Sequence, residues 1–199
     1  MRDLIKPAAV LFLVSVVVVV LLALTDQATA PIIADRIKAD LDAAKKSVLP
    51  VAESFQELEI PADLAKASEG LSTIQQAWVA KDSKGTIVGL VVSAASKGYA
   101  GPVGFTVGLD ATGKVAGVKA GAHKETPGLG DKVLVATSKV MKQLATLAPT
   151  GPLKTVKAPP AANEVDAISG STITSRAAVR AVSGAWELST RLTAEGAWK

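Results

Sequence analysis

The chain has 199 residues, and 22 basic against 18 acidic residues give it a net charge of +4. This length predicts one domain with room for an appended segment, and the mild, unclustered charge with 4% aromatic residues argues against nucleic-acid binding. The lack of cysteine excludes disulfides, iron–sulfur ligation and thiolate chemistry, and the single histidine, His123, excludes a multi-histidine metal site within one chain.

Residues 1–30 predict a transmembrane helix. No charged residue lies between Pro7 and Thr25, and a helix over 7–24 spans roughly 27 Å, close to the hydrocarbon thickness of a bilayer. A cleavable signal peptide is the alternative, with the small residues of 28–30 as its cleavage site, but its apolar core usually runs only about 7–15 residues. We therefore favour a retained anchor. The basic residues before the span predict a cytoplasmic N-terminus, with the rest of the chain beyond the membrane.

Residues 31–74 are interpreted as a membrane-proximal helical segment. Ile33 and Ile37 recur at helical spacing, with charged residues between them, and Pro31 suits the first turn of a separate helix that ends near residue 48.

From residue 75 the pattern changes to strands. Two pairs of apolar runs are joined at 82–85 (DSKG) and 110–113 (DATG), which predicts two β-hairpins. Helical patterns follow from Asp131 to about residue 147 and again from about Thr174. The expected fold is therefore one N-terminal transmembrane helix followed by an α+β domain at 75–199, with a mainly antiparallel sheet and flanking helices.

Three segments carry more glycine or hydroxyl groups than turns and helix caps require. They are SKGYAGPVGF at 96–105, HKETPGLGDK at 123–132 and AISGSTITSR at 167–176. Glycine lets a backbone approach a bound group closely, and the last segment places five hydroxyl groups at the start of a helix, where free N–H groups favour a phosphate. It lacks the spacing of a nucleotide P-loop and of a hydrolase elbow.

The run from Asp166 to Thr172, DAISGST, resembles the flavinylation motif Asp-x-x-(Ser/Thr)-Gly-Ala-Thr of the FMN-binding domain family, with Ser171 in the place of the usual alanine. The stretches ETPGLG at 125–130 and GYAGPV at 98–103 also resemble stretches of that family. The resemblance implies that a flavin transferase joins FMN to Thr172 through a phosphoester, which makes the chain a phosphoprotein.

Several residues follow as candidates for cofactor binding, and no catalytic or metal-binding residue is predicted. Backbone N–H groups of Ile173, Thr174 and Ser175 and the hydroxyl groups of Ser169 and Thr174 are expected to bind the phosphate. Tyr99 and Leu129 are expected to contact the flavin ring. The full set is Gly98, Tyr99, Gly101, Glu125, Thr126, Gly128, Leu129, Asp166, Ser169, Gly170, Ser171, Thr172, Ile173, Thr174 and Ser175.

Two groups within the family share the implied layout. They are the G subunits of Rnf ion-translocating electron-transport complexes and the C subunits of sodium-translocating NADH:quinone reductases, which are typically longer. At 199 residues the chain looks more like the first group. The resemblance implies a single-pass inner-membrane protein with its flavin domain on the periplasmic face. It would relay electrons within an Rnf-type ferredoxin:NAD+ oxidoreductase complex as a redox subunit, rather than act as a complete enzyme, with other membrane subunits as its partners.

The residues alone are also compatible with three other functions. One is an anchored module that binds flavin noncovalently. Another is an exported hydrolase that uses His123 and one hydroxyl of 169–175, although no oxyanion or nucleophile motif accompanies them. The third is a purely structural subunit.

Overall fold

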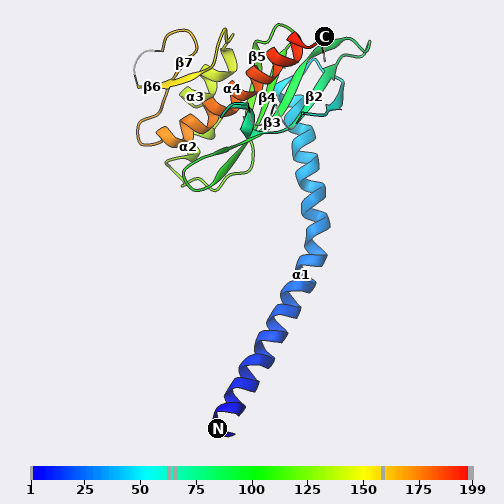
Figure 1. The fold of residues 1–199 in the computed structure, drawn as a ribbon, viewed down its shortest axis with the longest axis vertical. Coiled ribbons are helices and arrows are strands. Elements are labelled where there is room, and N and C mark those ends of the chain that lie inside the picture. Colours follow the sequence, from blue (N-terminus) through cyan, green and yellow to red (C-terminus); the bar gives the residue numbers. More distant parts are fainter. Residues whose placement is uncertain (1, 62–63, 65–66, 158–159, 197–199) are drawn as a thin grey trace. The chain divides into compact units, whose positions relative to one another are not determined.

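The computed structural model describes residues 2–61, 64, 67–157 and 160–196 (Figure 1). It divides into two compact units, residues 1–42 and residues 43–199. Each is described by itself.

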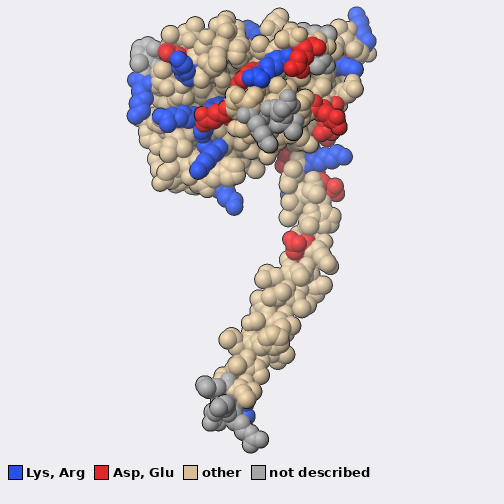
Figure 2. Space-filling model, in the orientation of Figure 1, with Lys and Arg blue, Asp and Glu red and all other residues tan. Residues whose placement is uncertain are grey.

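The first unit consists of most of helix α1 (Arg2–Val48). The sequence predicted separate helices on either side of Pro31, but Pro31 lies inside one continuous helix. Proline has no backbone N–H to donate, and the helix continues on both sides of this missing bond. Within the described residues, one helix, Ile5–Val48, is long and apolar enough to cross a membrane. Its uncharged part is visible in Figure 2 as a helical surface without blue or red side chains.

The second unit contains a five-stranded sheet of order β1-β2-β3-β4-β5, in which every neighbouring pair is antiparallel. The strands are β1 (Ser54–Leu58), β2 (Ile74–Lys81), β3 (Ile87–Lys97), β4 (Pro102–Asp110) and β5 (Val115–Ala120). The predicted antiparallel sheet is therefore confirmed. Edge strand β1 comes from the segment for which a helical region was predicted, and it pairs with β2 from Ser54 to Leu58.

The two predicted hairpin turns have the same hydrogen bonds. Asp82 Oδ1 accepts from the N–H groups of Lys84 and Thr86, and Asp110 Oδ1 accepts from those of Thr112 and Lys114. A glycine with positive φ closes each turn, at Gly85 and at Gly113. Both features are local in sequence, which is why a short motif predicts them.

The remaining elements are the short 3-10 helix η2 (Leu71–Thr73), helices α2 (Asp131–Leu134), α3 (Lys139–Thr146) and α4 (Thr172–Ala194), and a parallel pair of strands, β6 (Lys154–Val156) and β7 (Glu164–Asp166). Among them, α3, α4 and η2 contact the sheet. The helix predicted from Asp131 to about residue 147 is thus two helices. Ser138 separates them, because its hydroxyl donates to Val133 O and accepts from Met141 N as the N-cap of α3.

Helix α4 packs against β3 and β4, as Figure 1 shows, and supplies much of the core. Its buried alanine, valine and leucine side chains meet Leu90, Val92 and Phe105 of the sheet in a single hydrophobic cluster. On the sheet, Gly108 and Gly117 are in contact with Val48 at the end of α1. The core thus fixes the start of α4, where the hydroxyl-rich segment lies.

Candidate functional site

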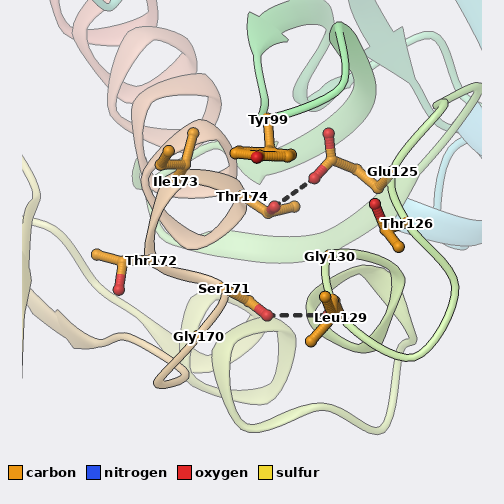
Figure 3. Close-up of a pocket in the computed structure, with 10 residues that line it drawn as sticks. All are labelled: Tyr99, Glu125, Thr126, Leu129, Gly130, Gly170, Ser171, Thr172, Ile173 and Thr174. Atoms are coloured by element: carbon orange, nitrogen blue, oxygen red, sulfur yellow. Dashed lines mark hydrogen bonds between the residues drawn. The ribbon is translucent and has the colours of Figure 1, made fainter.

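The three glycine-rich or hydroxyl-rich segments meet around one cavity of about 370 Å³ (Figure 3). The loop after β3, the loop before α2 and the start of α4 each supply part of its wall. The lining residues are Tyr99, Glu125, Thr126, Leu129, Gly130, Gly170, Ser171, Thr172, Ile173 and Thr174.

Glu125 connects the three segments. Its side chain is buried, with only 5% of its surface exposed. Oε1 accepts a hydrogen bond of 2.9 Å from Ala100 N in the loop after β3, and Oε2 accepts one of 2.5 Å from Thr174 Oγ1 in α4. A charged acceptor strengthens both bonds, so one carboxylate orders the wall of the cavity from within.

Two glycines make room for this carboxylate. A Cβ atom at Gly98 would lie 2.6 Å from Glu125 Oε1, and a Cβ atom at Gly130 would lie 2.9 Å from Glu125 Cβ. Neither distance is possible for a real side chain without movement of its neighbours. The extra glycines of the first two segments are therefore explained in part by close packing around Glu125.

The third segment turns sharply before it becomes a helix. Ser171 N donates to Ile168 O, and Gly170 has a φ of 80°, which glycine adopts without strain. Helix α4 begins at Thr172, two residues earlier than the sequence predicted. Ser175 N already donates to Ser171 O. The amides of Thr172, Ile173 and Thr174 thus form the first turn, where a helix offers no acceptor of its own.

The five hydroxyl groups of this segment have different partners. Ser171 donates to Leu129 O, Ser175 donates to Ser171 O, and Thr174 donates to Glu125. Within the described part of the chain, the hydroxyl groups of Ser169 and Thr172 form no hydrogen bond. Ser169 is exposed and does not line the cavity, whereas Thr172 is half-buried and does. Thr172 therefore differs from the other four hydroxyl residues, because it lines the cavity and its hydroxyl group has no hydrogen bond to a described residue.

Asp166, the first residue of the motif, lies outside the cavity lining. Its carboxylate forms an ion pair with Lys139 of α3. Its backbone is held by Gln143, whose Oε1 accepts from Asp166 N at 2.9 Å and whose Nε2 donates to Asp166 O at 3.3 Å. These contacts attach the beginning of the hydroxyl-rich segment to α3.

The structure thus brings together most, but not all, of the residues predicted to bind a cofactor. Those outside the lining are Gly98, Gly101, Gly128, Asp166, Ser169 and Ser175, and Gly98 lies in an adjoining cleft. Gly130, which belongs to the ETPGLG stretch singled out from the sequence, also lines the cavity. Among the described residues, no group of histidine, aspartate and glutamate side chains could hold a metal ion.

The cavity combines polar and apolar walls. Tyr99, Leu129 and Ile173 are apolar or aromatic side chains that remain 74%, 55% and 46% exposed. Figure 3 shows the Tyr99 ring near Ile173 and Glu125, with Leu129 on the other side of the cavity. Such walls suit a ligand with a flat apolar part and a few hydrogen-bonding groups.

Comparisons with known proteins agree on one family. The family described as FMN-binding domain matches residues 98–187. The G subunit of the ion-translocating oxidoreductase complex of Stutzerimonas stutzeri is 32% identical over 181 residues, which cover 90% of this chain and 78% of that protein. The G subunit of the Na(+)-translocating ferredoxin:NAD(+) oxidoreductase complex of Acetobacterium woodii is 33% identical over 186 residues, which cover 89% of this chain and 87% of that protein.

Among solved structures, NqrC of Shewanella oneidensis matches with a TM-score of 0.49 and 18% identity, over 75% of this chain and 88% of that one. The identity and coverage of the two G subunits, together with the domain match, assign the family. The chain belongs to the FMN-binding domain family and, within it, to the G subunits of ion-translocating oxidoreductase complexes.

Proposed function

We propose that this chain is a membrane-anchored flavoprotein subunit that carries FMN covalently on Thr172. In that role it relays electrons within an Rnf-type ferredoxin:NAD+ oxidoreductase complex, together with other membrane subunits. The observation that carries the proposal is the position of Thr172 in the wall of the cavity, where the residue is half-buried and its hydroxyl group has no hydrogen bond to any described residue. Relatives named as G subunits of such complexes support the same role.

The start of α4 suits the phosphate of the cofactor. The N–H groups of Thr172, Ile173 and Thr174 belong to the first turn of a 23-residue helix, where free donors and the helix dipole favour an anion. A phosphodiester on Thr172 keeps one negative charge, so these donors stabilise the attached state. Thr174 takes part through its backbone, because its hydroxyl group donates to Glu125.

Attachment forms one bond and breaks one. Thr172 Oγ1 would bond to the phosphorus of an activated flavin nucleotide, a diphosphate that is the substrate of a flavin transferase, and the hydroxyl proton would pass to solvent. The nucleoside monophosphate on the other side of the diphosphate would leave with the broken P–O bond. Covalent attachment suits a domain beyond the membrane, where a lost cofactor could not be replaced from the cytoplasm.

The rest of the cavity suits the flavin ring and its sugar chain. Its volume of about 370 Å³ lies within the usual range of cofactor sites, about 300–1,000 Å³. Tyr99, Leu129 and Ile173 supply apolar contact area, and the buried carboxylate of Glu125 orders the loop that carries Tyr99. When bound, FMN supplies the reversible redox chemistry, and this chain orients it and sets its surroundings.

Membrane anchoring by α1 is part of the proposal. An 18-residue window of its candidate span has a mean hydropathy of 3.1, and no residue of that window is buried against other parts of the described chain. The basic residues before the apolar run favour a cytoplasmic N-terminus, which would place the flavin domain on the periplasmic face of the inner membrane.

Flavin retention after denaturation tests the covalent bond to Thr172. The full chain made together with a flavin transferase is expected to keep its yellow fluorescence on a denaturing gel and to gain the mass of an FMN phosphoester. Thr172→Ala should abolish both signals, whereas Thr172→Ser retains a hydroxyl group and should keep part of the loading.

Ser83→Ala is the matched control, because Ser83 is an exposed hydroxyl residue in the turn between β2 and β3, outside the motif at 166–172, and the variant should load normally. If Thr172→Ala kept covalent flavin, the attachment residue would lie elsewhere. Flavin released from the wild-type protein on denaturation would instead support a noncovalent module.

A further inference from the structure

A second cleft, of about 330 Å³, adjoins the flavin cavity. The two share Tyr99 and Ile173 in their walls, and the second cleft is completed by Lys97, Gly98, Arg176 and Arg180. Arg176 lies one helical turn after Thr172, at the i,i+4 spacing that places two side chains on the same side of a helix. A molecule held in this cleft would therefore sit beside the flavin without entering its cavity.

The cleft carries an excess of positive charge. Arg180 is partly neutralised, because it pairs with Glu69 at 2.6 Å and donates to Lys97 O at 2.8 Å. Lys97 and Arg176 are exposed, and among the described residues neither forms an ion pair. Arg180 Nε is buried and has no hydrogen-bond partner within the described chain. The bonds of Arg180 fix the wall of the cleft, and the two exposed cations remain available.

The cleft also exposes apolar surface. Tyr99 and Ile173, which divide it from the flavin cavity, are 74% and 46% exposed. Tyrosine and arginine are the residue types most enriched where proteins bind one another, and exposed apolar side chains flanked by polar ones are typical of such contacts. A protein partner therefore matches the composition of this cleft.

We infer that the second cleft is the docking site for an acidic segment of the protein that exchanges electrons with the flavin. The inference rests on the proposed function, because it takes the neighbouring cavity to hold FMN. Carboxylates of the partner would meet Lys97 and Arg176, while apolar side chains of the partner would cover Tyr99. The partner would then lie directly against the flavin site.

An anionic membrane surface matches the cleft less well. Recognition of anionic lipid commonly uses clusters of about 4–8 basic residues, whereas two exposed cations flank this cleft. Opposite charges at a contact site mainly accelerate encounter, and salt weakens that effect. Charge-dependent and salt-dependent access to the flavin is therefore the measurable consequence.

Small charged oxidants test this access on the full, flavin-loaded chain in a neutral detergent. Ferricyanide is an anion and hexaammineruthenium(III) a cation, and each accepts one electron from the reduced protein. At low salt, the double variant Lys97→Glu/Arg176→Glu is expected to lower the ratio of the two rates (ferricyanide over hexaammineruthenium) by about tenfold. At 1 M salt, where the screening length is about 3 Å, that difference should disappear.

Lys84→Glu/Lys114→Glu is the matched control, because it reverses two exposed lysines in the hairpin turns. Lys84 precedes β3 whereas Lys97 ends it, so the two residues are separated by roughly 30 Å of extended strand. The control should leave the ratio of rates unchanged. An unchanged ratio in the cleft variant would overturn the inference. A shifted midpoint potential with an unchanged ratio would also overturn it and make Arg176 a flavin contact.

A binding measurement that does not require flavin separates this inference from the proposed function. A fluorescent hexaglutamate peptide should bind the full chain, loaded or not, about tenfold more tightly at low salt than it binds the cleft variant. Equal binding to both proteins would refute docking here even if Thr172 carries FMN. Cleft-dependent binding to anionic but not neutral lipid vesicles, without peptide binding, would assign the cleft to the membrane and overturn the protein-docking inference.

Discussion

Glu125 is the residue on which the cavity depends. It is buried, and its two oxygens accept from Ala100 N and from Thr174 Oγ1, which lie 25 and 49 residues away in sequence. Removal of a buried acceptor leaves its donors without partners, which costs more than the net contribution of the bonds themselves. The carboxylate thus links the cofactor loops to α4.

Substitution of Glu125 should destabilise the domain in proportion to the bonds lost. Glu125→Ala is expected to lower the free energy of unfolding by about 2–4 kcal/mol, and Glu125→Gln by about 1 kcal/mol, because the amide keeps one acceptor. Denaturant unfolding in detergent, followed by tryptophan fluorescence, measures both changes. Thr174→Val tests the partner, and the double variant should lose less than the sum of the two single variants. Strict additivity would contradict the coupling.

At the scale of elements, α3 holds the segment that leads to Thr172. The amide of Gln143 makes two hydrogen bonds with the backbone of Asp166, and Lys139 forms an ion pair with its carboxylate. At the other end, Ser171 is bonded to Leu129 O. The segment is therefore fixed on both sides of Gly170, which places Thr172 at the cavity.

Loss of the Gln143 contact should slow the attachment of flavin. Gln143→Ala removes both bonds to the Asp166 backbone, so the segment samples more conformations before Thr172 reaches the cavity, and we expect a several-fold lower rate of loading. Time courses of in-gel flavin fluorescence with purified transferase give that rate. Lys142→Ala, an exposed neighbour in α3, is the control. A wild-type rate in Gln143→Ala would show that α3 does not position the segment.

The hairpin between β4 and β5 should respond to acid through Asp110. Burial raises the pKa of Asp110, but hydrogen bonds from Thr112 and Lys114 and the charge of Lys114 lower it more, so the pKa lies below its ordinary 3.8. Its contribution to stability is therefore present above the ordinary pKa and is lost as the pH falls through the lowered one.

Thr112→Ala removes the hydroxyl donor to Asp110 and should move the pKa of Asp110 upward, toward 3.8. Thr112→Ser keeps the hydroxyl group and should preserve the lowered pKa. Carboxyl carbon shifts in an NMR titration report both values. Equal pKa values in the alanine variant and the wild type would exclude the hydroxyl bond as a cause.

At the scale of the whole molecule, the chain joins an apolar helix to a cofactor domain. The helix qualifies as a candidate span by length and composition, a test that a signal sequence near the N-terminus also passes. The length of the uncharged run, 7–25, favours a retained anchor.

Expression in a bacterial cell distinguishes an anchor from a cleaved leader. The retained helix predicts an intact mass that includes residues 1–30 and a protein that stays with membranes through carbonate washing. Substitution of Leu13 and Val17 by arginine should release the protein from the membrane or block its insertion. Each arginine near the centre of a span costs about 2.5–3.5 kcal/mol on translocon scales. An N-terminus at Pro31 in the mature protein would establish cleavage instead.

Much of the secondary structure of this protein could be predicted, because it depends on interactions between residues that are close in sequence. The apolar run and the antiparallel strands follow from patterns that span a few residues, and the Asp-x-x-Gly turns form bonds only two to four residues apart. The sequence predicted that the last helix begins near Thr174, just after the motif at 166–172, and the helix begins two residues earlier, at Thr172. Most of the residues expected at the site line one cavity. They could be predicted because the three segments are long enough for their unusual composition to be recognised in the sequence.

The sequence by itself determined the apolar helix, the antiparallel sheet, the turns and the segments from which the site is built, because local bonding and periodicity encode them. Only the tertiary structure decided how the hydroxyl groups are used. Thr174 was expected to donate to a phosphate, but its hydroxyl group donates to Glu125, 49 residues away, and Thr172 is left at the cavity. The pairing of β1 with β2 was decided in the same way. Such contacts depend on how distant parts of the chain pack together, and no pattern of neighbouring residues records that packing.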